Sequence, residues 1–262
     1  MDDFIEQNNT QSEEPKFTDV IVGRNPVMEA LRSGREIDKL LIAHGAQNGS
    51  TRAIVAKCRE RKIPVKEVAP QKLDFMSGGA SHQGVALVVA SHNYCSVDDI
   101  LKVAKERNEA PFIIVCDGIE DPHNLGAIIR TAEACGVHGI IIPKHRSASL
   151  NAVVAKSAAG ALEYMQVARV TNITACLEEL KEKGLWLYAA DMDGQSWCSV
   201  DYRGACAFII GSEGRGVSPL VKKSCDVIVS LPMAGKINSL NASVAAGVLM
   251  YEAARQKQGI KN

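Results

Sequence analysis

The chain has 262 residues, 46% of them hydrophobic, and its formal net charge is zero. This composition is typical of a globular protein with one large core or two smaller ones. No apolar run reaches the roughly 18 residues of a membrane-spanning helix, and the acidic start Met1-Asp2-Asp3 differs from the basic and then apolar start of a secretory signal. We therefore expect a cytoplasmic protein without a membrane partner.

The first 90 residues divide into an acidic leader and a basic domain. Residues 1–16 carry five acidic side chains against Lys16 and are rich in polar residues, which predicts a disordered leader. Residues 17–90 carry eleven Lys or Arg against seven Asp or Glu. Their hydrophobic pattern predicts strands at 19–23, 37–43, 65–68 and 85–90, helices at 26–32 and 50–61, and a helical turn from residue 71. Together these elements would form a small α/β domain.

Basic side chains concentrate between Arg52 and Lys66, where Glu60 is the one acidic residue. A solvated helix face and a surface that contacts phosphate groups both explain this pattern, and the sequence leaves the two open.

Residues 91–109 are polar and charged and predict a linker with a helix at 97–107, which Pro111 would end. From residue 110 to 262 the predicted strands become continuous apolar runs, at 112–116, 139–142, 185–190, 207–210 and 227–231. Such runs, separated by helical segments, are typical of a parallel sheet covered on both faces. Ligands of such sheets bind beyond the carboxyl ends of the strands.

The eight cysteines are scattered along the chain without a C-x-x-C pair and without a histidine at zinc-binding spacing. Cys116 and Cys206 lie within apolar runs, which is typical of buried, reduced thiols. We therefore expect reduced cysteines and no metal site.

A first polar loop follows the strand at 112–116. Asp121 is expected to cap a helix whose first residue is Pro122. Arg130 is the one cation in the apolar part of this helix, and it would either pair with an acid such as Glu133 or bind a phosphate or substrate group.

A second loop, Gly211-Ser212-Glu213-Gly214-Arg215-Gly216, follows the strand at 207–210. Its glycines would let the backbone approach a ligand closely. The spacing G-x-x-G-x-G differs from the dinucleotide fingerprint G-x-G-x-x-G, so an enzyme with a nicotinamide or flavin cofactor is poorly supported. Glu213 alone could be an ordinary solvated acid.

A third loop, 231–243, runs from an apolar strand into a polar cluster at a predicted helix start. Ser239 and Asn241 are expected to begin this last helix, which the apolar pattern places at 244–255. One polar residue suffices to cap a helix, so the others could face a ligand.

The order, spacing and residue types of the three loops resemble the three motifs of the SpoU or TrmH-type RNA ribose methyltransferases, of the SPOUT superfamily. The resemblance covers residues 111–256 and rests on Asn124-Leu125-Gly126 with Arg130, on Gly211 to Gly216, and on Leu231-Pro232-Met233-Ala234-Gly235 with Ser239-Leu240-Asn241. The preceding domain, with Gly23-Arg24-Asn25-Pro26 and Ser81-His82-Gln83-Gly84-Val85, is similar to the small ribosomal-protein-like RNA-binding domain of the members directed to ribosomal RNA.

The resemblance implies S-adenosylmethionine as the cofactor, methylation of a ribose 2′-hydroxyl in RNA, a homodimer, and a deep trefoil knot in the carboxyl-terminal α/β domain. Its catalytic pattern matches Asn124, Arg130, Glu213, Ser239 and Asn241. Its cofactor-binding pattern matches Gly211, Glu213, Leu231, Met233 and Leu240.

By the same analogy, the substrate would be a guanosine of 23S ribosomal RNA, because a separate basic domain suits the recognition of a structured RNA. A transfer RNA substrate and a non-catalytic RNA-binding relative are the alternatives. A guanidinium is a poor base, so we expect Arg130 to bind a phosphate and to lower the pKa of the ribose hydroxyl. The proton would then pass to phosphate, water or another group of the site.

Overall fold

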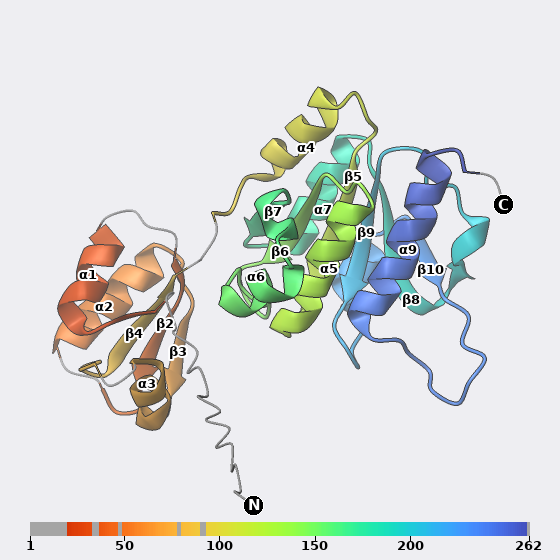
Figure 1. Cartoon of the computed structure of the whole chain (residues 1–262). Coiled ribbons are helices and arrows are strands. Elements are labelled where there is room, and N and C mark those ends of the chain that lie inside the picture. Colours follow the sequence, from red (N-terminus) through yellow and green to blue (C-terminus); the bar gives the residue numbers. More distant parts are fainter. Residues whose placement is uncertain (1–19, 33–36, 47–48, 78–79, 90–92, 261–262) are drawn as a thin grey trace, which may run out of the picture.

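The computed structural model describes residues 20–32, 37–46, 49–77, 80–89 and 93–260, so the leader expected at 1–16 lies outside the described residues. The described chain forms two sheets, one of four strands and one of six, which belong to two domains that lie side by side (Figure 1).

The small domain is a mixed sheet with helices on both faces. Its elements are β1 (Val20–Val22), α1 (Arg24–Arg32), β2 (Ile37–Ala43), α2 (Gly49–Glu60), β3 (Val65–Val68), α3 (Pro70–Ser77) and β4 (Val85–Val89). The strand order is β1-β4-β2-β3, in which only β2 and β3 are parallel. Successive side chains of β2 point to opposite faces of the sheet, so that Leu40 packs with α1 and α2 and Leu41 packs with α3.

The large domain is a six-stranded parallel sheet in the order β10-β8-β9-β5-β6-β7. Its elements are α4 (Val97–Glu106), β5 (Phe112–Asp117), α5 (Pro122–Ala134), β6 (Gly139–Pro143), α6 (Ala152–Ala158), η1 (Ala161–Glu163), β7 (Gln166–Val170), α7 (Ile173–Glu182), β8 (Trp186–Ser196), η2 (Trp197–Ser199), β9 (Cys206–Gly211), α8 (Pro219–Lys223), β10 (Val227–Ser230) and α9 (Ala242–Lys257).

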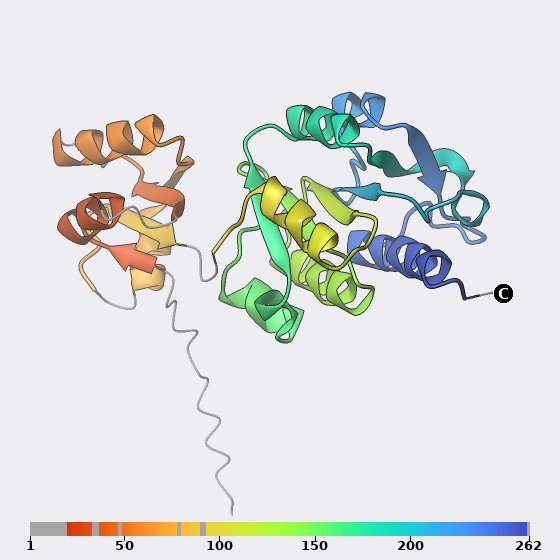
Figure 2. The same cartoon turned by 90° about the horizontal axis from the view of Figure 1, so that it is seen from above.

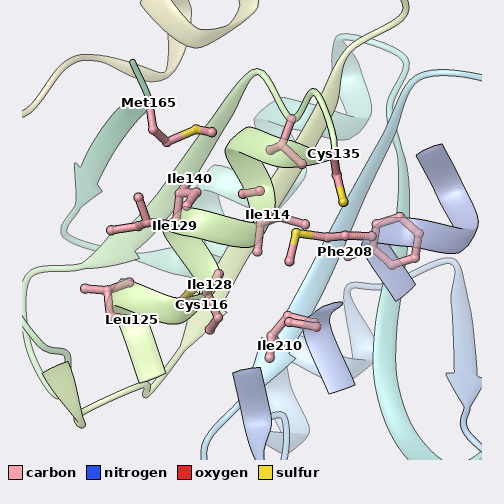
Figure 3. Close-up of a cluster of buried hydrophobic side chains, with 14 of the residues drawn as sticks. Ile114, Cys116, Leu125, Ile128, Ile129, Cys135, Ile140, Met165, Phe208 and Ile210 are labelled. Atoms are coloured by element: carbon pink, nitrogen blue, oxygen red, sulfur yellow. The ribbon is translucent and has the colours of Figure 1, made fainter. Parts of the chain in front are cut away.

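Helices cover both faces of this sheet, as the apolar strand sequences require. Helices α5, α6 and α9 pack on one face, and α4, α7 and α8 pack on the other (Figure 2). The first of these two cores joins strand residues such as Ile114 and Phe208 to Leu125 and Ile129 of α5 (Figure 3). The site loops are therefore supported by a rigid, fully buried scaffold.

The expected parallel sheet with helices on both faces is confirmed, and each strand and helix expected from the sequence is present, with small differences at the ends. The strand expected at 185–190 is longer than expected, because β8 continues to Ser196. Residues 19 and 90 of the expected strands lie outside the described residues. The cap of α5 is also as expected, because the side chain of Asp121 accepts a hydrogen bond from the backbone of His123 and Pro122 opens the helix. All eight cysteines are unpaired, and burial raises the pKa of the Cys116 thiol to about 12. One expectation is wrong: Ser239 does not belong to the last helix, which begins at Ala242.

The two domains meet at a buried polar cluster, here called the interdomain joint (Asp38, Tyr94 and Arg169). Nη1 of Arg169 in β7 donates a hydrogen bond of 2.7 Å to Oδ1 of Asp38 in β2. The Tyr94 hydroxyl donates to the same carboxylate over 3.2 Å, and the Arg169 guanidinium lies 5.1 Å from the centre of the Tyr94 ring. Asp38 is only 1% exposed, so this ion pair is shielded from solvent.

Candidate active site

The three polar loops meet at the carboxyl end of the large sheet. The first follows β5 and the second follows its neighbour β9, while the third follows β10 and enters α9. Parallel strands place their carboxyl ends at one edge of a sheet, which is why loops so distant in sequence come together.

A hydrogen-bonded cluster joins Asn124 in the first turn of α5, Glu213 in the second loop and Asn241 at the end of the third loop. Nδ2 of Asn124 donates to Oε1 of Glu213 over 3.0 Å. Nδ2 of Asn241 donates to Oδ1 of Asn124 over 2.9 Å and to Oε1 of Glu213 over 2.5 Å. Asn124 is buried, whereas Glu213 and Asn241 are exposed. One end of the cluster is therefore enclosed by the protein, and the other end is open to solvent.

Asn241 also caps α9. Its Oδ1 accepts hydrogen bonds from the backbone N–H groups of Ser243 and Val244, at 3.0 and 3.3 Å. The side-chain oxygen therefore caps the helix while the side-chain nitrogen holds the cluster together.

A cavity of about 410 Å³ opens beside this cluster. This volume lies within the range of pockets that bind small molecules. All five residues expected to bind a cofactor line the cavity, namely Gly211, Glu213, Leu231, Met233 and Leu240. Ser239 lines it as well, from the exposed segment before α9.

The glycine loop has no room for a side chain at its first position. A Cβ atom on Gly211 would lie 2.0 Å from the carbonyl carbon of Gly216 and 2.1 Å from the nitrogen of Val217. The loop closes on itself through two backbone hydrogen bonds between Ser212 and Gly216. Backbone groups therefore form this wall of the cavity.

The cavity also contains a charged pair that the sequence did not reveal. Asp191, in the middle of β8, pairs with Lys222 of α8. Burial opposes ionisation of Asp191, but hydrogen bonds from Lys222 and from the backbone of Met192 and Asp193 hold its pKa below the usual value. The one available signal was the position of Asp191, directly after a predicted strand.

Arg130 lies apart from the cluster. Its side chain is exposed on α5, does not line the cavity, and forms no ion pair with Glu133 or any other described residue. The structural ion pair considered for Arg130 is thus absent from the described part of the chain.

Among the described residues, no group of three or more His, Cys, Asp or Glu side chains is arranged to hold a metal ion. No helix in the described ranges is long and apolar enough to cross a membrane.

The chain matches two protein families over most of its length. Residues 111–251 match the SpoU rRNA Methylase family, and residues 20–95 match a domain described as RNA 2′-O ribose methyltransferase substrate binding. YacO of Bacillus subtilis, which is named for the TrmH family of tRNA/rRNA methyltransferases, is 45% identical over 92% of this chain and 97% of its own. A TrmH family protein of Staphylococcus aureus is 44% identical with the same coverage.

Solved structures agree with this assignment. The SpoU methyltransferase AviRb from Streptomyces viridochromogenes, crystallised with AdoMet, matches with a TM-score of 0.58 and 27% identity over 92% of this chain and 90% of its own. The A. aeolicus TrmH/SpoU tRNA modifying enzyme matches with a TM-score of 0.53 and 30% identity over 62% and 84%.

The fold and the three-loop site thus define an RNA methyltransferase with a separate substrate-binding domain. The chain belongs to the SpoU rRNA methylase family.

Proposed function

We propose that this RNA methyltransferase modifies the ribose 2′-hydroxyl of a guanosine in 23S ribosomal RNA. The cofactor is S-adenosylmethionine, in keeping with the family and with the AdoMet-bound AviRb structure. The observation that carries the proposal is the cluster of Asn124, Glu213 and Asn241 at the mouth of the 410 Å³ cavity. The small basic domain supports a structured ribosomal RNA as the substrate.

The cavity fits the cofactor in chemistry as well as size. Leu231, Met233 and Leu240 offer apolar surface, and the backbone around Gly211 offers hydrogen-bonding groups where no side chain fits. The cofactor supplies an electrophilic methyl group on a sulfonium. We propose these residues and Glu213 as its binding site.

The residues of the cluster act by placement. A ribose hydroxyl is a weak nucleophile that must lie in line with the methyl group to react. We propose that Asn124, Glu213 and Asn241 hold the glycine loop and the third loop in register, and that Ser239 contacts the substrate from the cavity wall. Arg130 would bind the adjoining phosphate and favour the ionised hydroxyl, with the proton passing to phosphate, water or another site group.

We propose that the working form is a homodimer. Helices α5 and α9 lie side by side (Figure 1) and border an open cavity of about 900 Å³, and Val244 and Tyr251 at its edge are 50% and 59% exposed. Exposed apolar side chains that gather on one face are typical of an interaction site. Arg130 belongs to the same helix as Ala127 and Thr131, which line this face, so a second copy seated here would lie close to it.

We propose domains at 17–90 and 110–262 with a linker at 91–109, of which α4 packs on the large sheet through Ile100. A trefoil knot in the large domain and a cytoplasmic location are proposed on the strength of the family resemblance.

The test is to map 2′-O-methylation across ribosomal and transfer RNA in cells with and without this protein. We expect loss of one mark in 23S ribosomal RNA, restored by the wild-type gene. Loss of a mark in transfer RNA alone would show that the ribosomal assignment is wrong.

A further inference from the structure

One loop of the large domain touches both the interdomain joint and the active site. This segment, Lys144 to Leu150, follows β6 and is here called the bridging loop. It was not among the residues assigned to substrate or cofactor.

At one end, the bridging loop is fixed to the interdomain joint. Nη2 of Arg169 donates a hydrogen bond to the carbonyl of Lys144 over 3.4 Å, while Nη1 holds Asp38 of the small domain. The backbone N–H of Leu150 donates to the Tyr94 hydroxyl over 3.0 Å. The loop therefore begins and ends at the contact between the two domains.

In its middle, the bridging loop reaches the active-site loops. The backbone N–H of Ala148 donates to the carbonyl of Ile119 in the first loop over 2.8 Å. A Cβ atom built on Gly118 would lie 3.9 Å from the carbonyl oxygen of Arg146 and 3.5 Å from Cβ of Ser212 in the glycine loop. The backbone of Arg146 thus lies beside Gly118, which in turn lies beside Ser212 in the wall of the cavity.

The loop carries three successive basic residues, Lys144, His145 and Arg146, and no acidic residue occurs between Glu133 and Glu163. His145 and Arg146 are exposed, Lys144 is half-buried, and none of the three forms an ion pair with a described residue. Arg146 has a φ of 55°, a left-handed conformation that is uncommon for a residue with a side chain. Such conformations persist only where the surrounding structure enforces them, and they concentrate at functional sites.

Further cations lie on the small-domain side of the joint. Burial lowers the pKa of Lys39, Asp38 raises it, and the positive charges of Lys66, Lys72 and Arg169 lower it further. Lys66 and Lys72 therefore lie within electrostatic range of Lys39, the neighbour of Asp38 in the chain. Lys66 and Lys72 are exposed.

We propose that the bridging loop binds RNA phosphates and leads the substrate strand from the small domain across the joint to the active site. The proposal rests on RNA methylation as the proposed function and names a positioning role for Lys144 and Arg146. It also separates two basic surfaces of the small domain, because Lys66 and Lys72 are electrostatic neighbours of Lys39, as Arg169 of the joint is, whereas Arg52 and Arg59 lie on α2, which packs on the face of the small sheet opposite to α3.

Three double variants of the full chain test the proposal: Lys144→Gln with Arg146→Gln in the loop, Arg52→Gln with Arg59→Gln on α2, and Lys105→Gln with Arg107→Gln as the control. Lys105 and Arg107 are exposed and precede β5, at the end of the sheet opposite to the site. Each variant loses two positive charges, so general electrostatic effects are matched. The probes are ribosomal and transfer RNA prepared from cells that lack the protein.

For the loop variant we expect roughly tenfold weaker RNA binding at 150 mM salt and a decrease of about 1.5 in the slope of log affinity against log salt concentration. The KM for RNA should rise by a similar factor, with kcat retained. Calorimetric affinity for S-adenosylmethionine and the unfolding temperature should remain those of the wild type. The control variant should match the wild type throughout.

The proposal would be overturned if the loop variant kept the wild-type slope of log affinity against log salt concentration. It would also be overturned if the control variant lost as much RNA affinity as the loop variant. A loss of RNA affinity in the α2 variant alone would place the RNA on the other face of the small domain, which would likewise overturn the proposal. If the wild type binds these RNAs but transfers no methyl group, the proposed function fails, while the salt slopes still decide whether the loop binds phosphates.

Discussion

The side chain of Asn241 both caps α9 and holds the active-site cluster together. Its oxygen accepts the free N–H groups at the start of α9, and its nitrogen donates to Asn124 and Glu213. The position therefore needs an amide: an alanine would lose both functions, and an aspartate would keep the cap and lose the donor.

We predict that Asn241→Asp reduces the rate of methyl transfer at least about 100-fold, because it removes a positioned donor and sets a carboxylate against Glu213. The free energy of unfolding should change by no more than about 1 kcal/mol, since the capping oxygen remains. Initial rates and denaturant unfolding measure the two effects. Ser243→Ala is the control, because Oγ of Ser243 only donates to the Asn241 oxygen. Near-normal turnover of Asn241→Asp would contradict a placement role for the cluster.

The sequence indicated Asn124 and Glu213 through the resemblance of their motifs to the SpoU family, and only Asn241 also lies in a segment with an unusual density of polar residues. The sequence did not indicate Asp191, Lys222 or Arg146 as residues at or near the site. Each of these is an ordinary charged residue in a short segment, and its importance comes from contacts with elements remote in the sequence. Such contacts depend on tertiary packing, which local pattern does not encode.

At the scale of elements, α5 holds the first site loop by packing very closely on α6. A Cβ atom on Gly126 would lie 2.4 Å from Cβ of Ser157 and 2.8 Å from the carbonyl oxygen of Val154. Two residues before Gly126, Asn124 enters the active-site cluster. The absence of a side chain at Gly126 therefore sets the position of a site residue.

We predict that Gly126→Ala lowers the free energy of unfolding by about 1–3 kcal/mol, because the added methyl group forces the two helices apart. Gly247→Ala is the matched control, since Gly247 is also within a helix but its Cβ would meet its nearest neighbour, Cγ2 of Thr131, at 3.7 Å. That substitution should stabilise the protein by about 0.5–1 kcal/mol. Denaturant unfolding measures both, and equal effects of the two substitutions would show that the helix contact is not tight.

The elements that the sequence predicted best were those with strong local signals. The apolar strands β5, β6 and β9 are buried on both faces and have continuous hydrophobic runs. Strand β7 was not expected, because its sequence Gln166-Val-Ala-Arg-Val is interrupted by polar residues that suit the edge of the sheet. Arg169 in this strand donates a hydrogen bond to Asp38 of the small domain, a contact that no local pattern could indicate.

At the scale of the whole molecule, the exposed apolar face of α5 and α9 is the surface that we propose for the dimer. Tyr251 and Val244 lie on it, while the equally exposed Leu220 lies on α8, which belongs to the opposite helix layer. A comparison of these positions separates dimerisation from general surface hydrophobicity.

We predict that the wild type has twice the chain mass of 28.1 kDa in solution, and that Tyr251→Glu has the mass of one chain, because a buried unpaired carboxylate opposes association. Leu220→Glu should remain dimeric. Light scattering coupled to size-exclusion chromatography gives all three masses. A wild-type mass of 28.1 kDa would contradict the dimer.

The cluster of Asn124, Glu213 and Asn241 joins residues that are 89 and 117 positions apart in the chain. No product of interrupted translation that ends before Asn241 contains the complete cluster. During synthesis, the cluster can therefore form only after almost the whole of the large domain has left the ribosome. An incomplete chain that ends before Asn241 contains the substrate-binding domain but lacks the complete cluster.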